Sequence, residues 1–408
     1  MTEGDAARAT GREEWRASWF IVLVASLGIG VSQIHFLSFG FLMKPIEAET
    51  GWSRGDISAA TLIFSLLLAI SSPIAGRLID RGSERRIGIP AIILYCLLLA
   101  SLSQAGSSIW LWWGIWAALA CISPFASLLF WTTVTARRFD RQRGLALAIT
   151  LSGSGIGMTL MPIMTHFLVE AYGWHGAYLT FGLVGGAFVL PLAFLALDRP
   201  TLPGARSGAA RQAKLPWGEL LRSPPFLKLT FAGVVMSMMS ATLAVHFVPM
   251  QLARGIEPAI AAAATGLVGF GAILGRLIIG VLLDRSKGPL VGALTYALPV
   301  LPCILLLGIG PIPALALVIG FLFGLSSGSE TDVLSYFIAR YFGVARYGVV
   351  FGACFGIVGA AAGVGPWLAG LAYDATGNYV LVFGSLMPLA MLAAMALATL
   401  GPYPNEER

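Results

Sequence analysis

The chain has 408 residues, of which 57% are hydrophobic and 11% are charged, and its formal net charge is +6. Soluble globular domains carry about 25% charged residues, so this composition excludes a water-soluble globular protein. The basic residues lie in short clusters between apolar runs and do not form a basic face, which argues against a nucleic-acid-binding protein. The expected surroundings are a lipid bilayer.

Apolar runs of about 20 residues, each long enough to cross a ~30 Å hydrocarbon core, recur along the chain. Backbone polar groups must be paired within lipid, and no alternating strands of about ten residues occur, so these runs predict helices. The predicted spans are 18–43, 56–79, 87–105, 108–134, 144–169, 176–197, 226–252, 258–283, 289–308, 312–338, 346–371 and 379–400. The predicted fold is an all-α membrane protein with twelve transmembrane helices.

The longest polar stretch, 198–225, divides the spans into two sets of six. The predicted domains are a tail (1–17), an N-terminal six-helix bundle (18–197), a linker (198–225), a C-terminal six-helix bundle (226–400) and a second tail (401–408). The segment from Gly76 to Arg81 follows the second span and resembles Gly280 to Arg285 after the eighth, at a shift of 204 residues, half the chain length. The two halves are therefore expected to be six-helix repeats related by pseudo-two-fold symmetry.

The distribution of basic residues predicts the orientation in the membrane. Three of the 26 Lys and Arg residues, Lys44, Arg54 and Arg254, lie in segments on one side, Arg276 lies within a span, and the other 22 lie at the opposite side. Because basic residues are retained on the cytoplasmic side, both termini are expected to be cytoplasmic. The predicted location is the cell membrane, as a multi-pass protein.

Motifs of several enzyme classes are absent from the sequence. It contains no HExxH motif, no GxSxG elbow followed by a plausible triad, and no phosphate-binding G-x-x-x-x-G-K-[ST] loop. Cys96, Cys121, Cys303 and Cys354 lie in apolar runs without metal-ligand spacing. We therefore expect no enzymatic activity, no metal site, no cofactor and no direct coupling to ATP.

The pattern G-x-x-x-D-R after spans two and eight resembles the signature loop of the major facilitator superfamily, and the layout of the whole chain is similar to that family. In the first copy, Ser83 and Glu84 stand where the family has Gly and a basic residue, and Arg85 and Arg86 follow. The resemblance implies a transporter that works by alternating access.

A narrower resemblance involves the stretch from Phe39 to Ile46 followed by Gly51 to Arg54, and the segments Arg138–Phe139 and Arg143 to Ala146. These stretches look like those of the monocarboxylate-porter and oxalate:formate-antiporter branches. Two charges that some members of these branches use are missing here. Ala272 stands one turn before Arg276 in place of an acidic residue, and span eleven has no Lys.

Two ionisable residues within spans are candidates for the transport chemistry. An ionisable side chain in hydrocarbon costs several kcal/mol, so it usually faces a cavity or has a partner. The guanidinium of Arg276 can hold a carboxylate with two hydrogen bonds, which predicts a contact with an anionic substrate. Glu330 lies at a similar depth and is predicted to couple proton movement to transport. The alternative is a structural role in which Glu330 pairs with Arg276 or with the loop residue Arg340. Asp332 is expected to be structural.

Further candidates lie on helices that line the central cavity in this superfamily. Gln33 and His35 in span one, His246 in span seven and Trp131 in span four are predicted to contact substrate. For the histidines, a hydrogen bond that packs helices together is the competing interpretation. Four hydroxyl residues can shape the same cavity or simply pack helices: Ser123, Ser127, Ser237 and Ser240.

Charged residues at the predicted cytoplasmic ends of spans two and eight are expected to act as a gate. Asp80, Arg81, Asp284 and Arg285 can pair with neighbouring groups there and close the cytoplasmic side. Their predicted role is conformational, away from the substrate.

The leading hypothesis is a secondary active transporter of a small organic anion, in particular a monocarboxylate, by proton symport or anion exchange. Export of hydrophobic or drug-like compounds is an alternative within transport, and a non-transporting membrane receptor is an alternative of another class. The expected partners are the substrate, protons and the lipid bilayer, and the expected oligomeric state is a monomer.

Overall fold

The structure, a computed structural model, describes residues 11–139, 142–198, 217–285, 288–308, 310, 312–401 and 403. Residues 199–216, which are most of the predicted linker (198–225), and most of both predicted tails lie outside these residues. The first helix begins at Gly11, earlier than the predicted start at residue 18.

The described residues of the N-terminal half form ten helical elements. They are α1 (Gly11–Ser32), α2 (Ile34–Leu37), α3 (Phe39–Thr50), α4 (Arg54–Arg81), α5 (Glu84–Ser101), η1 (Leu102–Ser107), α6 (Ile109–Ile122), η2 (Ser123–Phe125), α7 (Leu128–Ala136) and α8 (Arg143–Leu197). The C-terminal half contains α9 (Trp217–Leu220), α10 (Pro224–Ala253), α11 (Pro258–Arg285), α12 (Gly288–Ala297), α13 (Val300–Gly308), α14 (Pro313–Ser327), α15 (Glu330–Phe342), α16 (Val344–Ala362), α17 (Val364–Thr376) and α18 (Val380–Ala398).

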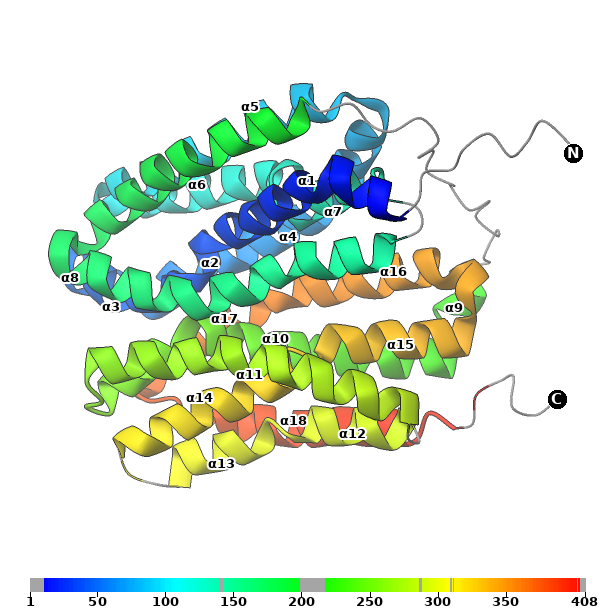
Figure 1. The fold of residues 1–408 in the computed structure, drawn as a ribbon. Coiled ribbons are helices and arrows are strands. Elements are labelled where there is room, and N and C mark those ends of the chain that lie inside the picture. The colour runs from blue at the N-terminus through cyan, green and yellow to red at the C-terminus, as the bar shows by residue number, and fades with distance from the viewer. Residues whose placement is uncertain are drawn as a thin grey trace, which may run out of the picture.

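The described elements form twelve membrane-spanning segments. Within the described residues, eleven helical segments are long and apolar enough to span a membrane. One of them, Leu145–Leu197, contains Gly173 with φ 65° and ψ −177°, and the chain reverses there, so this segment supplies two spans (Figure 1). A positive φ is tolerated at this position because glycine has no Cβ. The predicted twelve-helix fold is confirmed.

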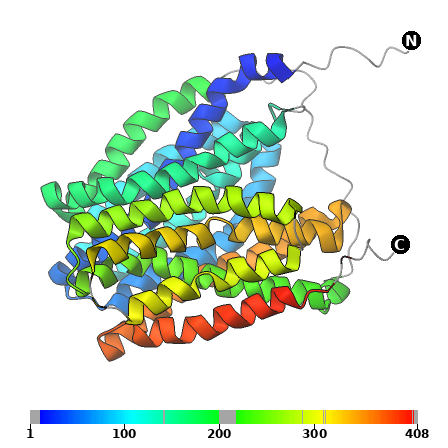
Figure 2. The same ribbon diagram turned by 60° about the horizontal axis from the view of Figure 1, so that its bottom comes forward.

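The two halves form two bundles that lie side by side along their whole length (Figures 1 and 2). One buried apolar cluster lies almost wholly within α1 to α8, and two more lie almost wholly within the C-terminal half. α1 begins and α18 ends at the same end of the molecule, at the right in Figure 1. We call this end the terminal end and the other the distal end.

Several predicted continuous spans are broken. In the first, the amide of Phe36 donates to the carbonyl of Gln33 at 3.1 Å. This leaves the carbonyl of Ser32 to accept a hydrogen bond from the Tyr95 hydroxyl at 2.7 Å. A side chain from another helix thus takes the place of a backbone bond, and the helix breaks at Gln33.

A second break separates α14 from α15. It lies where the end of α14 packs closely against α11. A Cβ added to Gly324 would lie 2.2 Å from the carbonyl oxygen of Val268, and one added to Gly328 would lie 2.2 Å from that of Ala272. Only glycine permits such an approach. The next helix begins at Glu330, which places a carboxylate at a helix N-terminus, where negative charge is favoured.

Candidate substrate cavity

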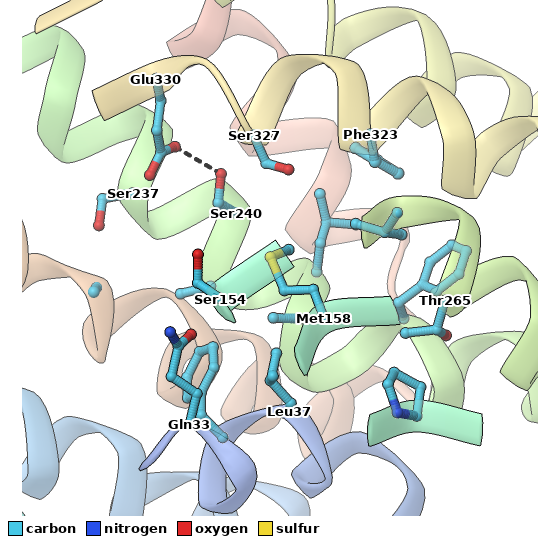
Figure 3. A pocket seen from close by; sticks show the side chains of 18 of the residues that line it. Gln33, Leu37, Ser154, Met158, Ser237, Ser240, Thr265, Phe323, Ser327 and Glu330 are labelled. Carbon is cyan, nitrogen blue, oxygen red and sulfur yellow. Dashed lines mark hydrogen bonds between the residues drawn. The ribbon is translucent and has the colours of Figure 1, made fainter. Parts of the chain in front are cut away.

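A cavity of about 400 Å³ lies between the two halves (Figure 3). Its lining from the N-terminal half consists of Gln33, Phe36, Leu37, Leu128, Ser154, Met158 and Pro162. Its lining from the C-terminal half consists of Ser237, Ser240, Ala241, Leu243, Ala244, Phe247, Thr265, Val268, Phe323, Ser327, Glu330, Thr331 and Ala362. Both halves therefore contribute side chains to one largely apolar site.

Glu330 is the ionisable residue among the described residues of this lining. The hydroxyl of Ser240 donates to its Oε2 atom at 2.8 Å. Figure 3 shows this pair at one side of the cavity, with Gln33 on the other side and Ser154 and Met158 between them. Gln33 reaches the cavity because it lies at the break between α1 and α2. The cavity thus has two polar sides separated by apolar side chains.

Arg276 pairs with Asp332, and not with Glu330. Its Nε atom lies 2.9 Å from Asp332 Oδ2. Glu330 and Asp332 are two residues apart on α15, about 200° around the helix, so they face different directions. The interpretation that Arg276 and Glu330 form an ion pair is therefore wrong, and the expectation of a structural role for Asp332 agrees with this contact.

Arg276 does not belong to the described cavity lining, but its partner Asp332 directly follows Thr331, a lining residue. Arg276 follows Thr265, a lining residue, by eleven residues on α11, which is about three turns and places both on the same face. Since α11 runs from the distal end towards the terminal end, Arg276 lies on the terminal side of the cavity. Its side chain is 46% exposed.

The two histidines and the tryptophan predicted to contact substrate are buried outside the described cavity lining. His35 is 4% exposed, and its Nδ1 bonds the Tyr95 hydroxyl at 2.8 Å. His246 is fully buried and bonds the carbonyl oxygen of Pro366 at 2.9 Å. Trp131 Nε1 donates to the carbonyl of Ala126 at 3.1 Å. In this arrangement the two histidines join helices, as their competing interpretation had it, whereas Trp131 bonds a residue five positions earlier in the chain.

The four hydroxyl candidates separate into two groups. Ser237 and Ser240 line the cavity. Ser123 is 2% exposed and, with Ser127, lies outside the described lining, at the break between α6 and α7.

The four residues predicted to form a gate lie at the terminal end. Asp80 and Arg81 are the last residues of α4, and Asp284 and Arg285 are the last residues of α11. Except for Arg285, which is exposed, their side chains lie outside what the structure describes. Their gating role stays a prediction.

A cluster at the distal end was not predicted. Arg54 of α4 donates from Nη1 to the Tyr379 hydroxyl at 2.8 Å, and its backbone amide donates to Asp374 Oδ1 at 3.0 Å. The sequence pattern treats Arg54 only as a basic residue between spans. Its partners lie more than 300 residues away in the sequence, and no spacing rule within one chain could link them.

Comparison with known proteins gives the family. The family model of the Major Facilitator Superfamily matches residues 18–354. Monocarboxylate transporter 12 of Homo sapiens is 23% identical, over 94% of this chain and 80% of its own length. The gallate transporter of Pseudomonas putida is 25% identical, over 83% and 84%. Monocarboxylate transporter 6 of Homo sapiens is 24% identical over 68% of this chain, and the match spans 58% of that relative.

Solved structures share the fold at low sequence identity. A mutant of the nucleoside transporter NupG superposes with a TM-score of 0.78 at 13% identity, over 94% of this chain and 99% of that one. A bacterial homologue of the human lysosomal transporter Spinster, in an inward-facing and occupied conformation, gives a TM-score of 0.68 at 14% identity, over 96% and 94%. With the family match covering most of its length, the chain belongs to the Major Facilitator Superfamily and is a multi-pass membrane transporter.

Proposed function

We propose that this chain is a secondary active transporter of organic monocarboxylates and has no enzymatic activity. The observation that carries the proposal is a cavity lined by both halves, with the Arg276–Asp332 pair on its terminal side. Alternating access needs a binding site shared by two halves that rock against each other. A cavity between the halves meets this requirement.

The lining supports a substrate with an apolar body. Phe36, Met158, Phe247 and Phe323 line the cavity together with aliphatic side chains. A cavity of about 400 Å³ falls within the usual range of about 300–1,000 Å³ for small-molecule sites. The substrate would place its apolar part among these side chains, and hydroxyl and amide groups would orient its polar end.

Arg276 is the proposed anion contact. Its guanidinium holds the Asp332 carboxylate in the absence of substrate. A substrate carboxylate has the same shape and charge, so it can replace Asp332 in the planar fork. Between transport cycles, Asp332 pairs with Arg276 in place of the substrate anion. This avoids the free-energy cost of an unpaired guanidinium near hydrocarbon.

Glu330 is the proposed coupling residue. It lies at the cavity, holds a hydrogen bond from Ser240, and is bordered by apolar side chains. A carboxylate in such surroundings can bind and release a proton as a charged solute arrives and leaves. This supports proton symport, with anion exchange as the other mode.

The membrane arrangement follows the charge pattern. We propose that the terminal end faces the cytoplasm of a cell membrane, that the stretch 198–225 links the halves on that side, and that the protein works as a monomer. Asp80, Arg81, Asp284 and Arg285 would then form the cytoplasmic gate.

A second candidate, export of neutral hydrophobic compounds, is favoured by the apolar lining and by the absence of a cation among the described lining residues. Counterflow into proteoliposomes separates the two functions. Under the first proposal, preloaded aromatic and branched carboxylates drive uptake of a labelled carboxylate, and neutral analogues of the same shape do not. Arg276→Gln then strongly reduces the flux at low substrate concentration. If only the neutral analogues exchange, the second candidate stands.

A further inference from the structure

The hydrogen bonds that join the two halves gather at one place. Each side-chain hydrogen bond between the halves in the described part of the chain involves α4 residues between Arg54 and Thr61, at the distal end. Their partners in the C-terminal half are Asp374, Tyr379, His246 and the carbonyl oxygen of Gly363.

The strongest of these contacts is a carboxylate from one half at a helix N-terminus of the other. Asp374 accepts hydrogen bonds from the backbone amides of Arg54, at 3.0 Å, and Gly55, at 2.7 Å. These amides begin α4 and have no partner within the helix, and the helix dipole favours a negative charge there. The backbones are also close, since a Cβ added to Gly370 would lie 2.6 Å from the carbonyl oxygen of Arg54.

The Arg54 side chain makes a second connection. It is 5% exposed, lies 3.1 Å from Glu47 of its own half, and covers the ring of Tyr373 at 3.7 Å from the centroid. Its Nη1 atom donates to the Tyr379 hydroxyl at 2.8 Å. A buried guanidinium thus contacts both halves at once.

The hydrogen bonds continue from Tyr379 to His246. His246 Nε2 lies 2.9 Å from the carbonyl oxygen of Pro366, which can only accept, so Nε2 carries the proton. In the neutral imidazole, Nδ1 is then the acceptor for the Tyr379 hydroxyl, at 3.0 Å. The direction of every bond from Arg54 through Tyr379 to Pro366 is therefore determined, and both Tyr379 and His246 are buried.

We propose that Asp374, Tyr379 and Arg54 form the gate that closes the distal end during transport, an inference that rests on the proposed alternating-access function. When the halves separate there, only the contacts between them break. Glu47 remains with Arg54, and His246 remains with Tyr379, because each of these pairs lies within one half. Asp374 is at the surface and becomes hydrated. No buried charge loses its partner, so the gate can open and close reversibly.

The test measures access to the cavity from the distal side. Ser154, a lining residue, is replaced by cysteine in a chain in which the exposed Cys121 is replaced by serine. A charged thiol reagent is added to sealed vesicles on the side opposite a tag placed after Arg408. Asp374→Asn and Tyr379→Phe are compared with Asp56→Asn. Asp56 lies on the same helix turn, but its carboxylate bonds Ser53 of its own half.

Asp374→Asn is expected to raise the rate of distal-side labelling roughly tenfold, the effect of losing one hydrogen bond to a charged group. Tyr379→Phe keeps the ring and is expected to raise the rate less, and Asp56→Asn is expected to leave it unchanged. Unchanged labelling in both Asp374→Asn and Tyr379→Phe, with size-exclusion profiles like the parent's, would overturn the gate.

Carboxylate uptake measured on the same vesicles separates this proposal from the proposed function. If distal-side labelling rises in the gate variants as expected, while the parent chain without gate substitutions transports no carboxylate, the gate stands and the substrate class is wrong. If the parent transports carboxylate and labelling does not change, the gate is wrong and the substrate class stands.

Discussion

The guanidinium of Arg276 lies 2.9 Å from the carboxylate of Asp332, across the gap between α11 and α15. The two side chains are 46% and 37% exposed, so the pair is not enclosed in the interior of the protein. A partly solvated ion pair contributes little to stability. Replacing Asp332 by a substrate carboxylate beside Arg276 therefore costs little free energy.

Replacing Arg276 should therefore affect substrate affinity in a graded way. Arg276→Lys keeps the charge but loses the planar fork, and we expect an increase in apparent KM of about tenfold. Arg276→Gln loses both the charge and the planar fork, and we expect an increase in apparent KM of about a hundredfold. The apparent KM of each variant is obtained from the uptake of a labelled carboxylate over a range of concentrations. Uptake by Arg276→Gln equal to that of the parent at low and saturating concentrations would remove Arg276 from the binding path.

The partner of Arg276 can be tested by folded yield. The Oδ2 atom of Asp332 is buried, so Arg276→Gln leaves that oxygen without its cation, which costs more than the intact pair contributes. Adding Asp332→Asn should therefore restore the yield of monodisperse protein without restoring transport. Adding Glu330→Gln instead should not restore it, because Glu330 bonds Ser240. If the yield recovered when Glu330→Gln was added to Arg276→Gln, but not when Asp332→Asn was added, this would contradict the pairing of Arg276 with Asp332.

Glu330→Gln should separate exchange from coupling. Glutamine keeps the size and accepts the hydrogen bond from Ser240 but cannot carry a proton. We expect carboxylate counterflow to persist while accumulation driven by an imposed proton gradient is lost. Ser240→Ala serves as the control, since it removes the hydrogen bond and keeps the carboxylate. Gradient-driven accumulation by Glu330→Gln at the parent's level would exclude Glu330 as the coupling residue.

The spans and the pairing of halves were predictable because hydrocarbon thickness imposes a length on each apolar run and because the loop from Gly76 to Arg81 resembles that from Gly280 to Arg285. Glu330 and Gln33 both line the cavity. The cost of an ionisable group in lipid indicated this for Glu330, and the superfamily resemblance indicated it for Gln33. Their roles in transport stay predictions.

The remaining features depend on contacts that a single sequence does not encode locally. The break at Gln33 requires the Tyr95 hydroxyl, which comes from another helix. The choice of Asp332 as the partner of Arg276 depends on the rotation of α15, which follows its break from α14 at Gly328. Likewise, the contact between Arg54 and Asp374 exists only in one arrangement of the halves.

Close helix packing at Gly153 gives a stability prediction. A Cβ there would lie 1.9 Å from the carbonyl oxygen of Ser26, so α8 contacts the backbone of α1 directly. We expect Gly153→Ala to lower the melting temperature and the folded yield, because backbone would have to move. Gly384→Ala is the matched control, since nothing lies within 4 Å of a Cβ at that position on α18. A melting temperature for Gly153→Ala at or above the parent's would contradict this packing.

The last prediction concerns a surface cluster at the distal end that joins α3 to the turn in α8. Glu49 accepts hydrogen bonds from Trp174 Nε1 and His175 Nε2, each at 2.8 Å. The other imidazole nitrogen, Nδ1, bonds the carbonyl oxygen of Ser103. Since a carboxylate and a carbonyl can only accept, this arrangement has a partner for a proton on each nitrogen of His175 and favours the protonated imidazole.

Hydrogen bonds from His175 and Trp174 lower the pKa of the Glu49 carboxyl from its ordinary value of 4.5. A lowered pKa means that the ionised carboxylate stabilises the fold fully above that ordinary value, and that this contribution is lost as the pH falls through the pKa of the folded protein. We expect Glu49→Gln to lower the melting temperature at about pH 6 and to have a smaller effect at about pH 3.5. Glu257→Gln, at another exposed glutamate near the distal end, is the control. A difference between the parent and Glu49→Gln that stays constant over this pH range would show that the carboxylate charge has no part in holding α3 to the turn.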